Sequence, residues 1–152
     1  MQLSYKPAQR EDAPAIFAFV RELIERYETD PELDLEMALD WTRRKIEKRI
    51  DEYTRVLADG EIAAYYRLAP DGERLELDDL YVLPAFRDQG IGTSILRHCL
   101  ALEKPIYFYV FTENTRAIAL YEREGFRKSE DVSPTRCIMA QDRGLSFGGE
   151  GV

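Results

Sequence analysis

The spacing of apolar residues predicts a chain that begins with one strand and two amphipathic helices. Residues 2–6 favour a short strand. Asp12 and Pro14 follow, and these residue types are typical of the start of a helix. Two sets of side chains then recur at helical spacing: Ile16, Val20, Leu23, Ile24 and Tyr27, and Leu35, Leu39, Thr42, Ile46 and Ile50. Each helix is therefore expected to bury one face.

Between residues 54 and 82 the pattern changes to strands. Residues 54–58, 61–68 and 75–82 are rich in branched and aromatic side chains. The turn sequences Asp59-Gly60 and Pro70-Asp71-Gly72 separate them, and Asp-Gly between two strands is a strong hairpin signal. We therefore expect three consecutive antiparallel strands.

The alternation within residues 75–82 changes phase. Leu75 and Leu77 occupy odd positions, whereas Leu80 and Val82 occupy even positions. A slip of one residue indicates a β-bulge, and a strand buried on both faces would give the same pattern. A bulge would bend the strand away from a neighbour and leave backbone groups of residues 80–82 free to pair with something other than protein.

A glycine loop follows this strand and leads into a helix that begins near Gly90. The apolar stripe of this helix comprises Ile91, Ile95, Cys99 and Leu102, with Leu96 and Leu100 beside it. The first N–H groups of a helix lack internal partners, and the helix dipole favours negative charge there. Glycine also lets a ligand approach the backbone closely. The loop therefore predicts a phosphate site, although the two glycines could equally make only a turn.

The remaining pattern completes an α+β fold of three layers. Residues 106–111 form a continuous apolar run, typical of a buried strand that lies parallel to the earlier one. Asn114 is placed to cap a helix that ends at Gly125, and residues 135–139 predict the last strand. We expect a mixed, mostly antiparallel central sheet with a bulged strand and helices on both faces. Residues 1–141 would form one domain and residues 142–152 a flexible tail.

Composition narrows the classes of function. The chain has 152 residues, of which 45% are hydrophobic and 11% aromatic, which suits one globular domain. A net charge of -8 argues against binding to nucleic acid and favours a cationic substrate. One histidine and two cysteines are too few for a structural zinc site, so we expect no metal. Neither a signal peptide nor a membrane span is apparent, which predicts a cytoplasmic protein without membrane association.

Three groups of residues resemble the GNAT superfamily of acyl-CoA-dependent N-acetyltransferases. They are Leu80-Tyr81-Val82 with Pro84, the Arg-x-x-Gly-x-Gly loop of residues 87–92, and Asn114 with Ala117, Tyr121, Glu122, Gly125 and Phe126. Their order and spacing, and the elements around them, match the family from residue 1 to about residue 140. The resemblance implies a GNAT-like fold, acetyl-CoA as co-substrate, and transfer of its acetyl group to a primary amine.

The resemblance also implies the cofactor-binding residues. The backbone of the bulged strand would pair with the pantetheine arm, and the glycine loop would wrap the pyrophosphate. Asn114 would contact the arm, and Val82 N–H would donate to the thioester oxygen. The complete set is Leu80, Tyr81, Val82, Arg87, Asp88, Gln89, Gly90, Ile91, Gly92, Thr93 and Asn114.

Direct transfer to an amine requires one group that gives a proton and one that accepts a proton. Tyr121 matches the family's tyrosine near the thioester sulfur, and we expect it to be the general acid; otherwise it only packs on its helix. One glutamate position of the family is occupied here by Tyr109. Another corresponds to Glu76, our expected general base, with Asp78, Asp79 or water as substitutes.

The acceptor and the assembly state are left open by the sequence. The family's acceptor pocket would lie near Trp41, Tyr65 and Tyr66. A crowd of acidic residues between 22 and 36 is either a solvated face or a rim that steers a cationic amine. Acceptors would then be small cationic amines, lysine side chains or N-terminal amines, and a homodimer stays open. The alternative function is a non-catalytic acyl-CoA-binding sensor or interaction module.

A dinucleotide-binding unit is disfavoured, because the loop lacks the third glycine of Gly-x-Gly-x-x-Gly and follows antiparallel strands. A nucleotide P-loop is excluded by the missing Gly-Lys-Ser/Thr.

Overall fold

The computed structural model describes residues 1–141, and the tail expected at 142–152 lies outside this range. Its helices are α1 (Ala13–Tyr27), α2 (Leu35–Lys48), α3 (Ile91–Leu100) and α4 (Thr115–Arg123). Its strands are β1 (Leu3–Pro7), β2 (Tyr53–Ala58), β3 (Glu61–Asp71), β4 (Arg74–Val82), β5 (Ile106–Phe111), β6 (Phe126–Asp131) and β7 (Arg136–Gln141). Short 3-10 turns lie at Arg10–Asp12, Ile50–Glu52 and Pro84–Phe86.

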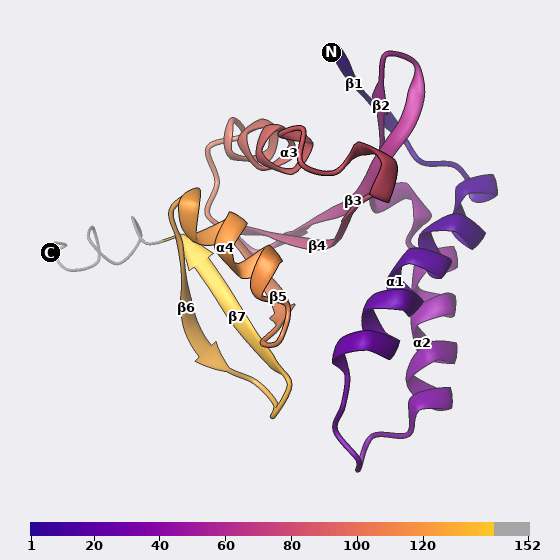
Figure 1. The fold of residues 1–152 in the computed structure, drawn as a ribbon, viewed down its shortest axis with the longest axis vertical. Coiled ribbons are helices and arrows are strands. Elements are labelled where there is room, and N and C mark those ends of the chain that lie inside the picture. The colour runs from indigo at the N-terminus through magenta and orange to yellow at the C-terminus, as the bar shows by residue number, and fades with distance from the viewer. Residues whose placement is uncertain (142–152) are drawn as a thin grey trace, which may run out of the picture.

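The strands form one open sheet with the order β1-β2-β3-β4-β5-β7-β6. Neighbouring strands are antiparallel except β4 and β5, which are parallel and are joined through α3. Helices α1 and α2 lie together on one side of the sheet, and α3 and α4 lie on the other (Figure 1). The predicted fold class, a mixed and mostly antiparallel sheet with helices on both faces, is confirmed.

Two hydrophobic cores fix these layers. The larger core lies between the sheet and the α3–α4 side, and its fully buried members include Leu77, Ile91, Ile95, Leu96, Cys99, Phe126 and Met139. The smaller core joins α1 and α2 to the opposite face through Ile16, Val20, Ile46, Tyr53 and Tyr65. Burial of such apolar surface is the main force that holds each helix pair to the sheet.

Strand β4 contains the predicted bulge. Tyr81 pairs with Tyr65 and Asp78 pairs with Arg67, so β4 has one residue more than β3 between these pairs. The backbone of Asp79 is left-handed, with φ of 53°. Leu77 and Leu80 both pack on the larger core. The two aspartates between them therefore project from the other face, towards α1 and α2.

Strands β4 and β5 pair over a short distance only. Their register joins Leu75 to Ile106 and Glu76 to Tyr107, and no later pair of the two strands is hydrogen bonded. Beyond this point β4 continues past its bulge to Val82, while β5 pairs with β7 on its other side. The two strands therefore diverge, and the part of β4 after the bulge has one free edge.

Some predicted elements differ from the structure, including Ile50, which lies beyond the end of α2 at Lys48, and Pro70 and Asp71, which belong to β3. Strand β6 was not predicted, because Phe126 is its only buried residue and its sequence lacks an apolar alternation. Helix α3 ends at Leu100, so Leu102 does not continue the buried stripe and is 56% exposed.

Candidate active site

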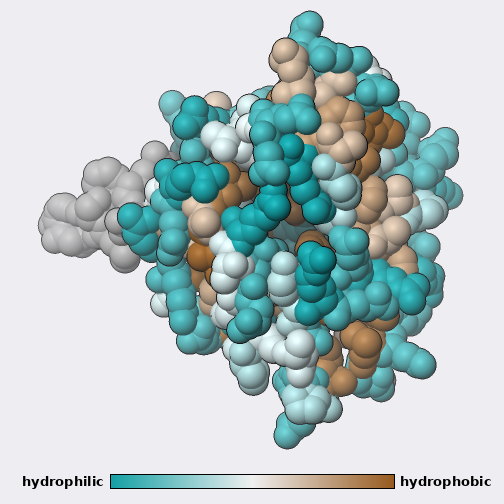
Figure 2. All heavy atoms as spheres, in the orientation of Figure 1, coloured by the Kyte–Doolittle hydropathy of each residue, from teal (hydrophilic) through white to brown (hydrophobic). Residues whose placement is uncertain are grey.

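A cavity of about 810 Å³ occupies the space where β4 and β5 diverge. Its walls are the second half of α1, most of α2 as far as Lys45, the bulged end of β4, the start of α3, β5, α4 and the first residue of β7. The space-filling view shows the surface hollowed near its middle, between these elements (Figure 2).

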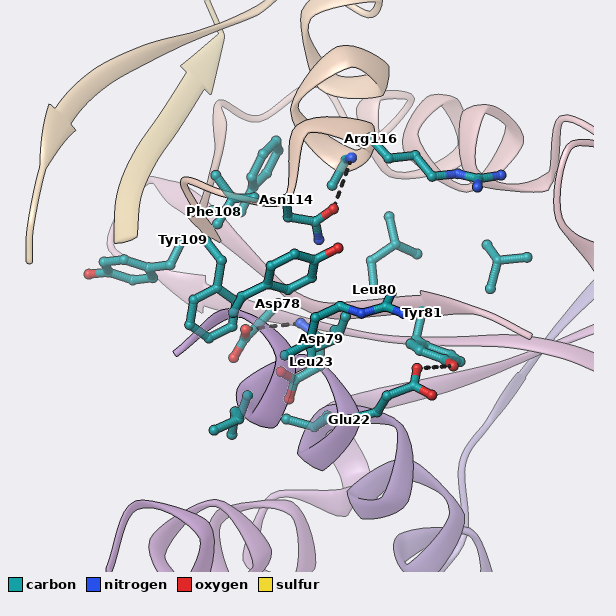
Figure 3. A pocket seen from close by; sticks show the side chains of 18 of the residues that line it. Glu22, Leu23, Asp78, Asp79, Leu80, Tyr81, Phe108, Tyr109, Asn114 and Arg116 are labelled. Carbon is teal, nitrogen blue, oxygen red and sulfur yellow. Dashed lines mark hydrogen bonds between the residues drawn. The ribbon is translucent and has the colours of Figure 1, made fainter. Parts of the chain in front are cut away.

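The close-up shows β4 residues on one side of this cavity and residues of β5 and α4 on the other (Figure 3). Most of the sequence-predicted site residues line it: Leu80, Tyr81, Val82, Arg87, Asp88, Gly90, Ile91, Gly92, Thr93, Asn114 and Tyr121. Gln89 and Glu76 do not. The amide of Gln89 is exposed and donates to the Ala85 carbonyl.

The free edge of β4 presents a backbone donor to the cavity side. Leu83 N–H donates to the Ala63 carbonyl of β3 at 2.9 Å. Successive N–H groups along a strand point to opposite sides, so Val82 N–H points away from β3, towards the gap. The Val82 carbonyl lies on the same side and accepts a hydrogen bond of 2.9 Å from Arg87 Nε. This contact fixes the start of the glycine loop against the strand.

The glycine loop ends in a helix start that is suited to an anion. Gly90 is the N-cap of α3 and has a left-handed backbone, with φ of 81°. The first hydrogen bond of the helix runs from Ser94 N–H to the Gly90 carbonyl. The preceding amides of Ile91–Thr93 find no acceptor within the described chain. Gly92 lets α3 approach α4 closely, because a Cβ there would lie 3.0 Å from Leu120 Cδ2.

Helix α4 brings Asn114 and Tyr121 to the opposite wall. Asn114 caps the helix by accepting a hydrogen bond of 3.2 Å from Ala117 N–H, as predicted (Figure 3). The ring centres of Tyr121 and Phe108 lie 4.0 Å apart. Burial raises the pKa of the Tyr121 phenol, and the charge of Asp78 raises it further. The phenol is therefore protonated at neutral pH.

The two aspartates of the bulge form a buried ionic cluster with Lys45 of α2. Lys45 Nζ lies 2.7 Å from Asp78 Oδ2 and 3.3 Å from Asp79 Oδ2. Tyr53 Oη donates to Asp79 Oδ2 at 2.7 Å, and Arg67 Nη1 lies 3.3 Å from Asp78 Oδ2. Burial and then the neighbouring Asp78 raise the pKa of Asp79 to about 6. Burial alone would raise the pKa of Asp78 also, but the cations Lys45 and Arg67 keep it low.

Glu76, the expected base, belongs to the last residue pair before β4 and β5 diverge. Its carboxylate is 3.6 Å from Arg67 Nη1. It also pairs with Tyr107 in the sheet register, where the two strands are still joined. Among the three carboxylates considered from the sequence, Asp78 and Asp79 line the cavity and Glu76 does not.

The aromatic residues expected near the acceptor divide into two groups. Trp41 lines the cavity and is 60% exposed. Tyr65 and Tyr66 are buried on opposite faces of β3: Tyr65 Oη donates to Asp12, and Tyr66 packs in the larger core. Neither of these two tyrosines lines the cavity.

Of the six cations that line the cavity, the sequence predicted only Arg87 as a site residue, and the partly buried Lys45 and Arg136 are among those it missed. A signal existed for Lys45, because it lies three residues after Thr42 on the stripe that α2 buries. None existed for Arg136, the first residue of β7, whose partners come from β5.

The acidic residues near α1 do not make the cavity acidic. Glu22 accepts a hydrogen bond from Tyr81 Oη, and Glu28 accepts one from Thr135 Oγ1. Six acidic and six basic residues line the cavity: Glu22, Glu28, Asp34, Asp78, Asp79 and Asp88, and Arg26, Lys45, Arg87, Arg116, Arg123 and Arg136. The charge of the site is therefore balanced, unlike that of the whole chain.

A strand with a free edge, a helix start suited to phosphate and a buried tyrosine lie together in one cleft, as the resemblance to acyl-CoA-dependent acetyltransferases predicts. The sequence of this chain matches the model of the acetyltransferase (GNAT) family over residues 17–126. The chain belongs to this family, and the resemblance predicted from its motifs is confirmed.

Individual relatives agree with this assignment. The chain is 36% identical over 75 residues to mycothiol acetyltransferase of Clavibacter sepedonicus, covering 46% of this chain and 25% of that protein. It is 35% identical over 51 residues to the peptidyl-lysine N-acetyltransferase YjaB of Salmonella typhimurium, covering 34% of this chain and 35% of that protein. The matches thus span about a quarter to a third of these relatives.

A solved structure shows the same fold. The PaiA N-acetyltransferase of Thermoplasma acidophilum, determined in complex with coenzyme A, superposes with a TM-score of 0.72 at 19% identity. The superposition covers 93% of this chain and 99% of that one.

Residues 1–141 lack two further features. None of the helices there has the length and apolar character needed to cross a membrane. Side chains of His, Cys, Asp and Glu do not gather there into a group of three or more that could hold a metal ion.

Proposed function

We propose that this protein transfers an acetyl group from acetyl-CoA directly to a primary amine. The observation that carries the proposal is the divergence of β4 and β5 after only two residue pairs. It leaves one edge of β4 free beside the cavity, and an extended amide-bearing arm can pair with such an edge. The amides at the start of α3 would hold the pyrophosphate of the same molecule.

The reaction needs no covalent enzyme intermediate. The amine nitrogen attacks the thioester carbonyl carbon, and the oxygen gains the negative charge of a tetrahedral intermediate. Val82 N–H is the donor that would stabilise this charge. The carbon–sulfur bond then breaks, the nitrogen keeps the acetyl group, and the sulfur leaves with the electron pair.

Tyr121 would stabilise the leaving sulfur. An ordinary thiol has a pKa of about 8.5 and a phenol about 10. Since the environment raises the pKa of Tyr121, full proton transfer to the thiolate is uphill. Tyr121 would therefore act mainly by donating a hydrogen bond while charge develops on the sulfur, and solvent would supply the proton as coenzyme A departs.

Asp79 is the carboxylate best placed to accept the proton of the amine. It lines the cavity, and its pKa of about 6 leaves it ionised at neutral pH. An alkylammonium with a pKa near 10.4 must lose a proton before or during attack. Asp79, acting through water, would take that proton, and Asp78 would hold Lys45 beside it.

The proposal is tested by incubating the purified protein with acetyl-CoA and a panel of primary amines and measuring thiol release. We expect Tyr121→Phe to bind coenzyme A normally and to lower kcat by about 100-fold, the effect of losing one hydrogen-bond donor to the charge that develops in the transition state. Tyr107→Phe is the matched control, since this phenol donates to Asp71 and lies outside the cavity lining. Cofactor binding without thiol release from any amine would instead favour the non-catalytic sensor.

A further inference from the structure

Arg136 is a cavity-lining cation whose guanidinium has no hydrogen-bonded or ion-paired protein partner in residues 1–141. Its Nε atom is buried and makes no hydrogen bond there, and no carboxylate lies within 4.0 Å of its guanidinium. Arg55 is the other arginine with a buried, unbonded Nε, but its Nη1 lies 3.8 Å from Asp12. Buried polar groups without a partner are rare in native proteins, and a bound ligand is one explanation for them.

The other basic residues of the cavity are accounted for. Lys45 pairs with the two aspartates of the bulge, and Arg116 Nη2 lies 2.6 Å from Asp88. Arg87 donates to the Val82 carbonyl. Arg26 and Arg123 are exposed, so water hydrates them. Arg136 alone among the six is both partly buried and unpaired within the described chain.

Two aromatic rings of β5 hold Arg136 in place. Its Cζ atom lies 5.2 Å from the ring centre of Phe111 and 5.6 Å from that of Tyr109. Cys137 packs in the larger core, so the alternation of β7 directs Arg136 to the opposite face, where the cavity lies. Stacked guanidinium groups keep their planar edge available for bidentate hydrogen bonds.

We infer that the amine acceptor carries a carboxylate and that Arg136 binds it. The inference rests on the proposed function and specifies the substrate class of the same site. A carboxylate matches the guanidinium fork with two parallel hydrogen bonds. Asp79, the proposed base, lines the same cavity and would receive the amine end of the acceptor. The acceptor is therefore a zwitterion that resembles an amino acid, with its carboxylate at Arg136 and its amine at Asp79. Such a molecule fits the balanced charge of the cavity better than a simple cation does.

The test compares each amino acid with the amine that remains when its carboxylate is removed. Suitable pairs are lysine with cadaverine and tyrosine with tyramine, with acetyl-CoA as donor. We expect Arg136→Gln to lower kcat/KM for the carboxylated members by about 10- to 100-fold, the effect of losing a charged hydrogen-bonded contact. Rates with the decarboxylated members should change less than about threefold. Equal effects on both members, or no preference of the wild-type protein for a carboxylate, would overturn the inference.

Two further experiments extend this test: one identifies the source of the carboxylate, and the other controls for structural effects of the substitution. Peptides with aspartate next to the reactive amine distinguish an acidic peptide from a free amino acid. Arg74→Gln is the matched control, because Arg74 also stacks on a β5 tyrosine, Tyr107, at 4.1 Å but pairs with Asp71 and does not line the cavity. It should leave every rate unchanged.

A binding measurement separates this inference from the proposed function. The 15N-edited NMR signal of the Arg136 Nε–H group should shift when amino acids are added to the protein with coenzyme A, and should not shift with the decarboxylated amines. A shift without turnover of any amine would support the carboxylate site and count against the transferase proposal. Turnover with neither an NMR shift nor a preference for a carboxylate would support the transferase proposal and count against the carboxylate site.

Discussion

Asp79 combines three features that rarely occur in one residue. Its backbone is left-handed, its side chain is buried, and a second aspartate precedes it. Aspartate tolerates this backbone region better than most residues. The bulge therefore turns two consecutive carboxylates to the same face. There, burial and then the charge of Asp78 raise the pKa of Asp79.

We predict that the acid limb of the pH–rate profile belongs to Asp79. Since its pKa is raised to about 6, kcat/KM should fall as the pH drops through 6, where the carboxylate gains a proton. Asp79→Asn should lower kcat/KM by about 100-fold or more and remove this limb. Asparagine also tolerates positive φ, so the bulge should survive.

Glu76→Gln, measured across the same pH range, distinguishes the two candidate bases. If Glu76 is the base, as the sequence predicts, its variant loses the limb and the Asp79 variant keeps it. If Asp79 is the base, the outcome is reversed. Retention of the limb in both variants would contradict a base at either position.

The sequence predicted the bulge but carried no information on the surroundings of these carboxylates. The phase change between Leu77 and Leu80 reveals one extra residue, which is a local property of the strand. The environment of each carboxylate is not local, since Lys45 comes from α2 and Arg67 from β3. A choice based on spacing in the family pattern therefore named Glu76, whereas the packing of distant elements puts Asp79 in the cavity.

At the scale of elements, the start of α3 depends on Gly90. A side chain there would face open space, so its cost comes from the left-handed backbone and not from a clash. We predict that Gly90→Ala lowers the free energy of unfolding by about 1–2 kcal/mol. It should also weaken coenzyme A binding measurably, because relaxation of this backbone turns the amides of Ile91–Thr93 away from the cavity.

Gly60→Ala is the matched control for the backbone cost. Gly60 has φ of 88°, a similar open surrounding, and a place in the β2–β3 hairpin away from the cavity lining. Urea unfolding should show a comparable loss for both variants, and calorimetric titration should show weaker binding for Gly90→Ala alone. Equal affinity of the two variants would contradict a role for the Gly90 turn in holding the cofactor.

The elements with strong local signals were predictable and the others were not. Asn114 and Gly125 mark the two ends of α4 by cap chemistry, and the helix runs between them. Strand β6 has no such signal, because five of its six side chains are exposed and its order comes from pairing with β7. An edge strand of this kind is specified by its neighbour in the sheet more than by its own pattern.

At the scale of the molecule, the short β4–β5 ladder joins two groups of strands, β1–β4 and β5–β7. The larger core continues across both groups on the α3–α4 side of the sheet. Only two residue pairs connect their strands, and the cavity occupies the rest of the boundary. A ligand that contacts both walls would therefore supply interactions that the sheet itself lacks there.

We predict that coenzyme A stabilises the whole protein and protects specific amides. At about 100 times its Kd, a ligand adds about 2.7 kcal/mol to the free energy of unfolding, which raises Tm by about 5–10 °C for a chain of this size. Hydrogen exchange should slow most at Val82 and at Ile91–Thr93, whose N–H groups face the cavity or lack acceptors in the described chain. Amide exchange in strand β1, at the far edge of the sheet, should slow only as much as the general stabilisation requires. A rise in Tm with equal protection of β1 and Val82 would place the cofactor elsewhere and contradict the proposed pairing with the free edge of β4.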